Sequence, residues 1–589
     1  MLKNIAWLYK PYIKYGKLFV ILSLLFWMII MPATAIIPVY FPQMIIDALE
    51  AQRSFAEIIR IVVAFSAILL FIPMYEDVFN WCYKNKMLAK IDLDIRRDVY
   101  IQSLKTDYKY IDNPKYYDDY AWTLNEYSNQ AHEAHNLILN LAASIITITV
   151  VVGIIVVTSP WIIILIVLNI VMRMFAHVKI DKLLLDRDEA IIPYDRKLDY
   201  FHRIFYQRGY SADLKSTLLK NYLLNKFEDN KNSKLNTIQK FGYKVLGLAL
   251  YCDVVYRLSL ALIMVMIVHG IYSGNIASIG MYITLILAVD RLDEHLFRLF
   301  DLIREAKRIS MYGDRVRRFF KLESDIESNM GNGEIILDRK VLSVEFKNVD
   351  FCYDNSNFAI SNFSLSIKPG EKVAIVGENG AGKTTFVKLL LRLYDIKDGE
   401  ILINGIPLKE YDVHSLRRCV GVAFQEPNIY ALSLLENIEL NSKLADKPQL
   451  QTLLNSFGIS KLISKNNASL DSELTKEFDD NGIVMSGGEI QKIGLARVFN
   501  RDFGLLILDE PSSALDPLAE YEMNKLILDS SNKSTTIMVA HRLSTIRDAD
   551  KIVLIDNGTV RESGTHEELM DAKEKYYEMF TKQAENYLR

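Results

Sequence analysis

Six long apolar stretches in the first 300 residues constrain this chain more than any other feature of its sequence. A helix needs roughly 20 mostly apolar residues to cross the hydrocarbon layer of a bilayer. The stretches cover Leu18–Pro42, Ile59–Tyr75, Leu137–Thr158, Trp161–Met174, Leu246–His269 and Ile276–Val289. The second and the sixth are weak by themselves and gain support from the overall count. The sequence therefore predicts an α-helical membrane domain with six spans.

The polar segments between these stretches indicate the topology. Short connections join spans one and two, three and four, and five and six, whereas long polar helical segments separate the others. The first long segment is basic and contains Lys84, Lys86, Lys90, Arg96, Arg97, Lys105, Lys109 and Lys115. Because basic loops tend to stay on the cytoplasmic side, we expect both termini inside. The basic start, Met1–Lys17, agrees and lacks the cleavage site of a signal peptide.

The pattern changes after the last apolar stretch. A charged helical region is followed by a polar segment around Gly331–Gly333, and from about Val344 short β-branched runs alternate with helical stretches. That alternation is typical of a parallel sheet with crossover helices. We therefore expect a transmembrane domain at 1–321, a linker at 322–343 and an α/β domain at 344–589.

Charge and cysteine content exclude some classes of protein. The net charge of −3 gives no sign of a nucleic-acid partner, because surfaces that neutralise phosphates are basic. The four cysteines, Cys82, Cys252, Cys352 and Cys419, are scattered and lack the spacing of metal ligands. We expect reduced thiols and neither a disulfide framework nor a zinc site.

A glycine-rich loop carries the strongest chemical signal. The sequence from Gly377 to Thr384 follows a strand-like run, Lys372–Val376, and precedes a helix-like run that begins at Thr385. Backbone N–H groups of such a loop surround phosphate oxygens, and the helix N-terminus favours negative charge. The predicted nucleotide-binding residues here are Gly377, Glu378, Asn379, Gly380, Ala381, Gly382, Lys383, Thr384 and Thr385. We expect Lys383 to meet the β- and γ-phosphates and Thr384 to ligate Mg²⁺.

An acidic pair at the end of an apolar strand completes the expected chemistry. Leu505–Leu508 leads to Asp509, which we expect to face the magnesium ion, and then to Glu510. A carboxylate at the position of Glu510 can polarise an attacking water as a general base. The pair is a weak signal by itself and becomes strong beside the phosphate loop.

The turn Ser486-Gly487-Gly488 ahead of a helix resembles the signature motif of ATP-binding-cassette (ABC) proteins. Met485 and Glu489 stand where Leu and Gln are commonest in that motif. The segment before it, Glu477–Gly482, also differs from the sequence that is commonest in exporters. With six spans in front of the cassette, the whole chain resembles an exporter-type ABC half-transporter. The resemblance implies an α/β P-loop ATP-binding cassette with ATP and Mg²⁺ as cofactors.

The resemblance also assigns roles to residues that would be unremarkable alone. Tyr353 matches the aromatic residue that stacks on adenine, and Gln425 matches the Q-loop glutamine that contacts Mg²⁺ and water. Asp516 lies in the matched D-loop, and His541 matches the switch histidine. The catalytic set implied in this way is Glu510, His541, Gln425 and Lys383; the implied metal ligands are Thr384, Gln425 and Asp509.

The family resemblance further implies a dimer and a route of coupling. Two chains would enclose two ATP·Mg²⁺ between the phosphate loop of one and Ser486–Gly488 of the other. Because the sequence motifs are intact, a homodimer is expected, although an intact half can also pair with a second half-transporter. By analogy, Asn113–Asp119 and Gly209–Lys215 would form the helices that couple the cassette to the membrane domain.

Ionisable residues within the spans suggest no particular cargo. Asp253 and Arg257 lie four residues apart in the fifth span, so they can pair on one helix face or face a wet cavity. Asp290, Arg291 and Glu294 follow the sixth span, and Arg173 marks the inner end of the fourth.

Taken together, the sequence predicts an ATP-driven exporter of a small molecule, peptide or lipid, multi-pass in the cell membrane. An importer on the same frame and an ATP-gated channel or regulatory subunit remain alternatives. A soluble ATPase with a membrane anchor is disfavoured, because one span would suffice for it.

Overall fold

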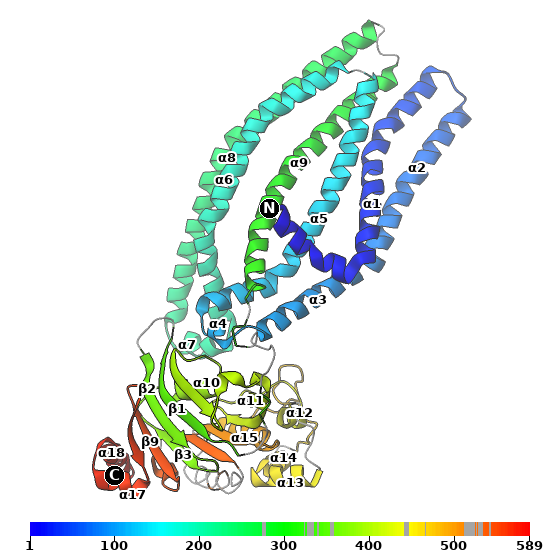
Figure 1. Cartoon of the computed structure of the whole chain (residues 1–589). Coiled ribbons are helices and arrows are strands. Elements are labelled where there is room, and N and C mark those ends of the chain that lie inside the picture. The colour runs from blue at the N-terminus through cyan, green and yellow to red at the C-terminus, as the bar shows by residue number, and fades with distance from the viewer. Residues whose placement is uncertain are drawn as a thin grey trace. The chain divides into compact units, whose positions relative to one another are not determined.

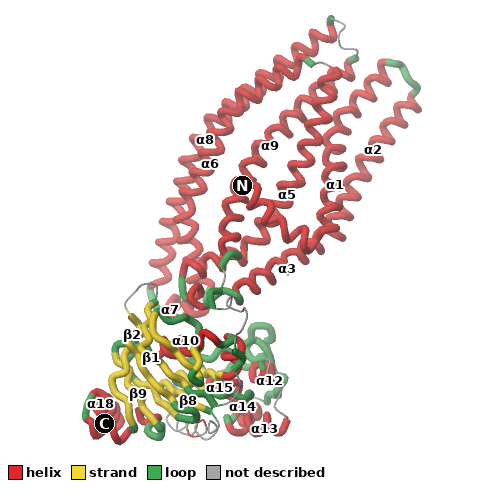
Figure 2. Tube along the Cα trace, in the orientation of Figure 1, coloured by secondary structure: helices red, strands yellow, loops and turns green. Residues whose placement is uncertain are grey.

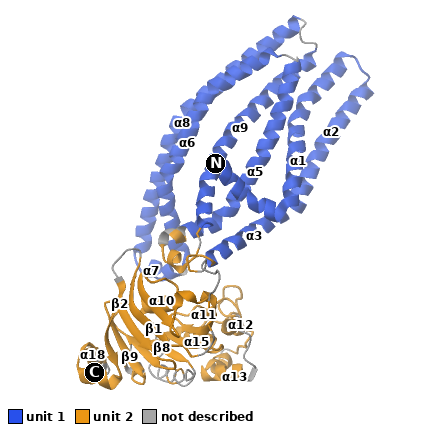
Figure 3. Cartoon of the chain, in the orientation of Figure 1, with its two compact units in different colours: residues 1–104, 118–321 blue, residues 105–117, 322–589 orange. Residues whose placement is uncertain are grey.

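Two compact units make up the chain in the computed structural model (Figure 3). One unit comprises 1–104 and 118–321, and the other comprises 105–117 and 322–589. The structure describes residues 1–158, 160–273, 278–322, 324–326, 335–337, 341–353, 358–440, 447–465, 467–511, 523, 525, 527, 534–540 and 543–588.

The first unit consists of helices joined by short loops and has no strand in its described residues (Figure 2). Long apolar sequence favours long helices here, although the first helix contains four prolines and a kink at Gly16. The chain turns back between the helices at short connections. The helices are α1 (Leu2–Glu50), α2 (Phe55–Val78), a π-helical segment (Phe79–Lys84), α3 (Asn85–Leu104), α5 (Pro114–Thr158), α6 (Trp161–Tyr206), a 3₁₀ turn (Arg208–Tyr210), α7 (Ser211–Ser216), α8 (Leu219–Tyr272) and α9 (Ile279–Phe319).

Five stretches of helix are long and apolar enough to cross a membrane, and they contain the first five predicted spans. The sixth predicted span, Ile276–Val289, begins outside the described residues and continues into α9. Within the described part, α9 lacks a sufficiently apolar window, since Asp290, Arg291 and Asp293 interrupt it. Its inward face is nevertheless apolar and packs in a core with α1, α5, α6 and α8.

Helices distant in sequence pack side by side in this unit. The helix α6 runs along α8, and α1 runs along α9 (Figure 1). Between α6 and α9 the buried Arg173 donates to Asp293 at 2.7 Å and to Asn169 at 3.3 Å. The Arg173 guanidinium also lies 3.6 Å from the ring centroid of Phe297. By sequence Arg173 marks the inner end of the fourth span; in the structure it is buried and joins α6 to α9 through Asp293.

Of the two arrangements expected for Asp253 and Arg257, the ion pair between them is absent among the described residues. Both side chains are exposed on α8, and they form no ion pair with each other. Helical i, i+4 spacing brings two residues to one face, but it does not fix the rotamers of exposed side chains.

The second unit is an α/β domain built on two sheets. A six-stranded sheet has the order β10-β9-β3-β8-β7-β6, and a four-stranded sheet has the order β2-β1-β4-β5. In the larger sheet β3 pairs parallel with β8 and β9, and β7 pairs parallel with β6 and β8. The strands are β1 (Val344–Cys352), β2 (Phe358–Ile367), β3 (Lys372–Val376), β4 (Asp398–Ile403), β5 (Ile406–Pro407), β6 (Val420–Ala423), β7 (Leu505–Asp509), β8 (Thr535–Val539), β9 (Lys551–Asp556) and β10 (Thr559–Gly564).

Strands buried on both faces account for the near-continuous apolar runs of β3, β7 and β8. One core lies between the two sheets, and a second lies between the large sheet and its helices. The helices are α10 (Lys383–Leu390), α11 (Val413–Cys419), α12 (Leu434–Glu439), α13 (Lys447–Ser456), α14 (Ile459–Lys465), α15 (Gly487–Phe499), α17 (His566–Ala572) and α18 (Lys575–Leu588), with short 3₁₀ turns at Leu408–Glu410 and Leu543–Ile546.

The segment 105–117 belongs to this second unit although it lies between two membrane helices in sequence. Asp107 accepts hydrogen bonds from the hydroxyl of Ser324 and, at 2.9 Å, from the backbone N–H of Asp325. The segment contains a short helix, α4 (Tyr108–Ile111), ahead of the predicted coupling helix Asn113–Asp119. That predicted helix is instead the first turn of α5, because Pro114 suits the first position of a helix. The second predicted coupling segment, Gly209–Lys215, contains most of α7.

Candidate functional site

The glycine-rich loop connects β3 to α10, as the sequence predicts. Two of its glycines have backbone conformations or surroundings that exclude a side chain. A Cβ on Gly377 would lie 2.3 Å from the carbonyl oxygen of Ile555, and Gly382 has a φ of +109°. The loop therefore keeps its backbone close to neighbouring strands, with its N–H groups at the start of α10.

Lys383 lies at the centre of this loop with only 6% of its surface exposed. Its Nζ donates to the carbonyl oxygens of Gly377 at 2.7 Å and Glu378 at 2.9 Å. Burial lowers the pKa of Lys383, while the charges of Glu510 and Asp509 oppose that shift. A cation is thus held among loop carbonyls and near two carboxylates.

Both carboxylates come from the end of β7. Since β7 and β3 run parallel in one sheet with β8 between them, their carboxyl ends lie on the same edge. Asp509 is 8% exposed, and burial, reinforced by the charge of Glu510, raises its pKa. The sheet topology therefore brings Asp509 into the electrostatic neighbourhood of Lys383.

Glu510 and Gln425 are direct partners. The Nε2 of Gln425, in the exposed turn after β6, donates to the Oε2 of Glu510 at 2.9 Å. Glu510 has a φ of +50°, a conformation that non-glycine residues rarely adopt and that often marks a functional position. Its backbone N–H donates to Val539 at the end of β8, at 3.1 Å, which holds this turn against the sheet.

Tyr353 lies over the first turn of α10. Its hydroxyl is 3.2 Å from the Oγ1 of Thr385, which is buried, and its ring meets the ring of Tyr394 edge-on at 5.3 Å. The ammonium of Lys388 lies 5.8 Å from the Tyr353 ring centroid and 5.1 Å from that of Tyr108 in α4. The aromatic residue expected at the adenine therefore shares two neighbours, Lys388 and Tyr394, with Tyr108 of the segment 105–117.

Asp112 and Tyr394 are residues that sequence reasoning missed. Tyr394 donates to Asp112 at 2.5 Å, and Lys388 donates to the same carboxylate at 2.9 Å. Asp112 lies more than 270 positions before both Lys388 and Tyr394, and none of the three matches a motif. No sequence signal could therefore have found this contact. Burial and the Asp112 carboxylate raise the pKa of Tyr394.

The turn Ser486–Gly488 forms the N-terminus of α15, and Ser486 and Gly487 are exposed. The backbone N–H of Ser486 donates to Glu489 at 2.8 Å. Although partial burial opposes it, hydrogen bonding from Ser486 lowers the pKa of Glu489. Glu489, which departs from the commonest signature sequence, thus closes the first turn of the helix. Within the described residues, no hydrogen bond joins Ser486–Gly488 to the loop Gly377–Thr384.

The remaining predicted site residues of the phosphate loop are mostly exposed. Glu378, Asn379, Gly380 and Thr384 are exposed along the loop, and Ala381 is buried beneath it. Asp516 and His541 lie outside the described residues, so their predicted roles have no structural test here.

Comparisons with known proteins agree with this geometry. Residues 360–513 match the family model described as ABC transporter. The chain is 30% identical to the subtilin transport ATP-binding protein SpaT of Bacillus subtilis over 576 residues, which is 96% of this chain and 92% of that protein. It is also 35% identical to the ATP-dependent lipid A-core flippase of Escherichia coli over 43% of this chain and 44% of that protein.

The fold has a counterpart over its whole length. The solved structure of a bacterial Atm1-family ABC exporter with ATP bound covers 97% of this chain, and this chain covers 98% of that one. The TM-score is 0.79 at 21% sequence identity, so this likeness concerns the fold.

A helical membrane domain fused to a P-loop cassette with these motifs defines an ATP-driven transport protein. The chain belongs to the ABC transporter family, as an exporter-type half-transporter. It binds ATP in its cassette and couples the ATPase cycle to export across a membrane that it spans several times. The family, fold class and function predicted from the sequence are confirmed.

Proposed function

We propose that this chain hydrolyses ATP with Glu510 as the general base and Gln425 as the residue that positions it. The observation that carries the proposal is the 2.9 Å hydrogen bond from Gln425 to Glu510, at the sheet edge where Lys383 emerges. A carboxylate there can accept a proton from the attacking water, while Lys383 neutralises phosphate charge. His541 is proposed to orient the γ-phosphate and Asp516 to contribute from the D-loop, both from the family resemblance.

Mg²⁺ is proposed as the metal cofactor. Thr384, Gln425 and Asp509 would supply a hydroxyl, an amide and a carboxylate oxygen, the donor types that Mg²⁺ prefers. The fit is supported by Asp509, a buried carboxylate beside the phosphate loop whose charge is compensated only in part by Lys383. When bound, Mg²⁺ would neutralise charge that develops on the phosphates.

The nucleotide is proposed to lie with its adenine on Tyr353 and its phosphates in the loop Gly377–Thr384, beside Thr385. The half-buried Tyr353, whose hydroxyl lies 3.2 Å from the buried Thr385 hydroxyl at the start of α10, supports this pose. In this pose the nucleotide does not contact Ser486–Gly488 of the same chain. That motif is then available to bind a second nucleotide.

A homodimer is the proposed assembly. Ser486 and Gly487 are exposed at the N-terminus of α15, where backbone N–H groups are ready to bind an anion supplied by another chain. Asp253 and Arg257 are exposed on α8 in a predicted span, and a charge facing lipid costs about 2.5–3.5 kcal/mol or more. A partner chain or a wet interface between two chains would remove that cost.

The cargo is proposed to be a peptide and the location the bacterial cell membrane, with both termini cytoplasmic. The relative that matches along 96% of the chain, membrane domain included, is named for subtilin transport, whereas the lipid A-core flippase matches 43%. We keep the division into domains at 1–321, 322–343 and 344–589 as part of this proposal, with 105–117 associating with the cassette.

The experiment that tests the proposal is hydrolysis by the full chain alone in lipid nanodiscs. We expect Glu510→Gln to lower the rate of ATP hydrolysis by about 100-fold or more while nucleotide binding persists. Glu426→Gln is the matched control, because Glu426 is an exposed neighbouring carboxylate, and its rate should stay within about twofold of the wild type.

Each half of the proposal can fail separately. Equal rates for Glu510→Gln and the wild type would contradict the role of Glu510. A folded wild-type chain that binds ATP but does not hydrolyse it alone would contradict the homodimer and direct the search to a second half-transporter.

A further inference from the structure

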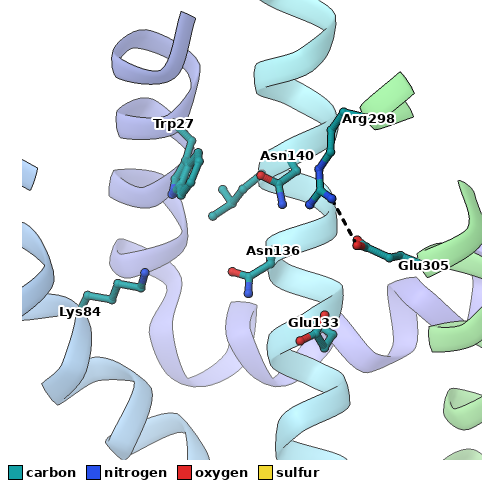
Figure 4. Close-up of a pocket in the computed structure, with 8 residues that line it drawn as sticks. Trp27, Lys84, Glu133, Asn136, Asn140, Arg298 and Glu305 are labelled. Atoms are coloured by element: carbon teal, nitrogen blue, oxygen red, sulfur yellow. Dashed lines mark hydrogen bonds and ion pairs between the residues drawn. The ribbon is translucent and has the colours of Figure 1, made fainter. Parts of the chain in front are cut away.

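A pocket of about 260 Å³ lies within the helical unit (Figure 4). Its lining comes from four separate segments: α1, the π-helical segment, α5 and α9. The residues are Trp27, Lys84, Glu133, Asn136, Leu139, Asn140, Arg298 and Glu305. A lining so rich in charged and amide groups is unusual for helices that are otherwise selected to face lipid.

The pocket lies where the apolar spans give way to polar sequence. Trp27 is inside the first apolar stretch, whereas Glu133 and Asn136 immediately precede the third and Arg298 follows the sixth. Lys84 ends the π-helical segment Phe79–Lys84, and π-helical turns inside long helices occur frequently at functional sites. The pocket is thus lined by the aromatic Trp27 and by charged and amide side chains near the end of the spans.

Most of the charge in the lining is already compensated. Arg298 donates to Glu305 at 3.5 Å, as the dashed line in Figure 4 marks, and Glu133 lies 4.0 Å from Arg308. Lys84, by contrast, forms no ion pair or hydrogen bond in the part of the chain that the structure describes. The lining thus contains two cations, Lys84 and Arg298, and two carboxylates, Glu133 and Glu305, and Lys84 is the one of these four without an ion pair among the described residues.

Hydrogen-bonding capacity accompanies that charge. Asn136 is 3.1 Å from the Nε2 of His132, whose Nδ1 is 3.0 Å from the Tyr12 hydroxyl, so the Asn136 amide is held in place from behind. Figure 4 shows Lys84 and Asn136 extending into the same space from different helices, with Asn140 one turn above Asn136. The side chains of Asn140 and Trp27 have no hydrogen-bond partner among the described residues. An ammonium, two amides and an indole N–H beside an apolar ring form a set of donors that suits an oxyanion.

We propose that this pocket binds the anionic end of the transported cargo, with Lys84 as its counter-ion and Asn136 and Asn140 as hydrogen-bond donors. The inference rests on the proposed export of a peptide, whose C-terminal carboxylate would supply the anion. At about 260 Å³ the pocket is smaller than the 300–1,000 Å³ typical of whole-ligand sites, so it holds a terminus and not an entire peptide. The phosphate of a lipid headgroup has the same chemistry and is the alternative source.

The test is competition binding to the full chain in nanodiscs of neutral phosphatidylcholine. The labelled probe is a short N-acetylated peptide of alternating leucine and serine with a free C-terminal carboxylate. The competitors are the same peptide, its C-terminal amide and lysophosphatidylglycerol. In the wild type the amide should compete roughly tenfold less well than the acid, as expected for one charge-assisted hydrogen-bonded pair.

Three variants make the test specific. Lys84→Gln should abolish the difference between acid and amide, and Lys84→Arg, which keeps the charge, should preserve it. Lys86→Gln is the matched control, because Lys86 is an exposed lysine two residues away that does not line the pocket. Preservation of the difference in Lys84→Arg also excludes misfolding as the cause of its loss.

The outcomes separate this proposal from the proposed cargo. If Lys84→Gln keeps the preference for the acid, or if neither the acid peptide nor lysophosphatidylglycerol binds saturably to the wild type, the pocket proposal is overturned. If the peptide does not bind and labelled lysophosphatidylglycerol, measured directly, binds through Lys84, the anion site stands, and the peptide cargo is the part that fails.

Discussion

Lys388 in α10 and Asp112 in the segment 105–117 form an ion pair of 2.9 Å, although 276 positions separate them in sequence. Tyr394 donates to the same carboxylate at 2.5 Å, and its ring packs edge-on against Tyr353 at 5.3 Å. The helix that follows the phosphate loop is thus tied directly to a segment that connects two membrane helices.

We predict that Asp112→Asn loosens the segment 105–117 from the cassette. Partial burial raises the pKa of Asp112, but hydrogen bonds from Tyr394 and Lys388 lower it more, so the pKa lies below its ordinary value. The depressed pKa means that the contact persists above the ordinary carboxyl pKa and is lost as the pH falls through the lowered one. Amide hydrogen exchange should rise in 105–117 at neutral pH in the variant, with nucleotide binding retained.

Lys105→Gln is the control for that experiment, since Lys105 is exposed in the same segment and forms no ion pair with α10 among the described residues. Unchanged exchange in Asp112→Asn would mean that the aromatic contacts of Tyr108 with Tyr394 suffice to hold the segment.

A second prediction concerns nucleotide binding at alkaline pH. Burial lowers the pKa of Lys383, and Glu510 and Asp509 raise it again. Because the phosphates require the charged lysine, affinity for ATP should fall as the pH rises towards the lowered pKa. Glu510→Gln removes one of the carboxylates that support the charge, so the fall should begin at lower pH in that variant. Equilibrium binding of a fluorescent ATP analogue across the alkaline range measures both curves; coincident curves would contradict the predicted coupling.

The buried pair Arg173–Asp293 supports a prediction about stability. Removing one partner of a buried ion pair leaves an uncompensated charge and typically costs about 3–5 kcal/mol. We expect Arg173→Met to lower the thermal unfolding midpoint of the chain in detergent strongly, and the double variant Arg173→Met, Asp293→Leu to recover part of the loss. Arg291→Met is the comparison, because the Arg291–Glu294 pair has the same 2.7 Å distance but is exposed. That pair should contribute no more than about 1 kcal/mol, and equal effects in the two single variants would argue against the buried tie.

The fourth prediction explains the unusual signature residue Glu489. A glutamine oxygen can also accept the N–H of Ser486, so Glu489→Gln should leave the ATPase rate close to that of the wild type. Glu489→Ala removes the acceptor at the start of α15, where a lost cap costs about 1 kcal/mol of stability, and should lower the rate below that of Glu489→Gln. Steady-state ATPase rates, with nucleotide binding measured in parallel, distinguish the two. A fall in Glu489→Gln as large as in Glu489→Ala would indicate that the negative charge itself is needed.

The amino-acid sequence by itself determined the two-part architecture, since spans reveal themselves by apolar length and the phosphate loop by glycine spacing. The same was true of Lys383, Asp509 and Glu510, because Lys383 begins the helix after the glycine-rich loop and the two carboxylates stand at the end of the apolar strand β7. Local pattern suffices where local geometry places a residue. It misled at Asn113–Asp119, where a proline begins a long helix instead of a separate coupling helix.

Only the tertiary structure decided the contacts between residues far apart in the chain. The pairing of Gln425 with Glu510 depends on the strand order of the large sheet, and Lys388 meets Asp112 only because 105–117 packs with the cassette. Arg173 reads as an ordinary basic residue at the end of a span, and its burial against Asp293 and Phe297 arises where α6 meets α9. Such contacts carry no local signal, because their energy arises from burial and charge pairing that exist only once the helices have packed.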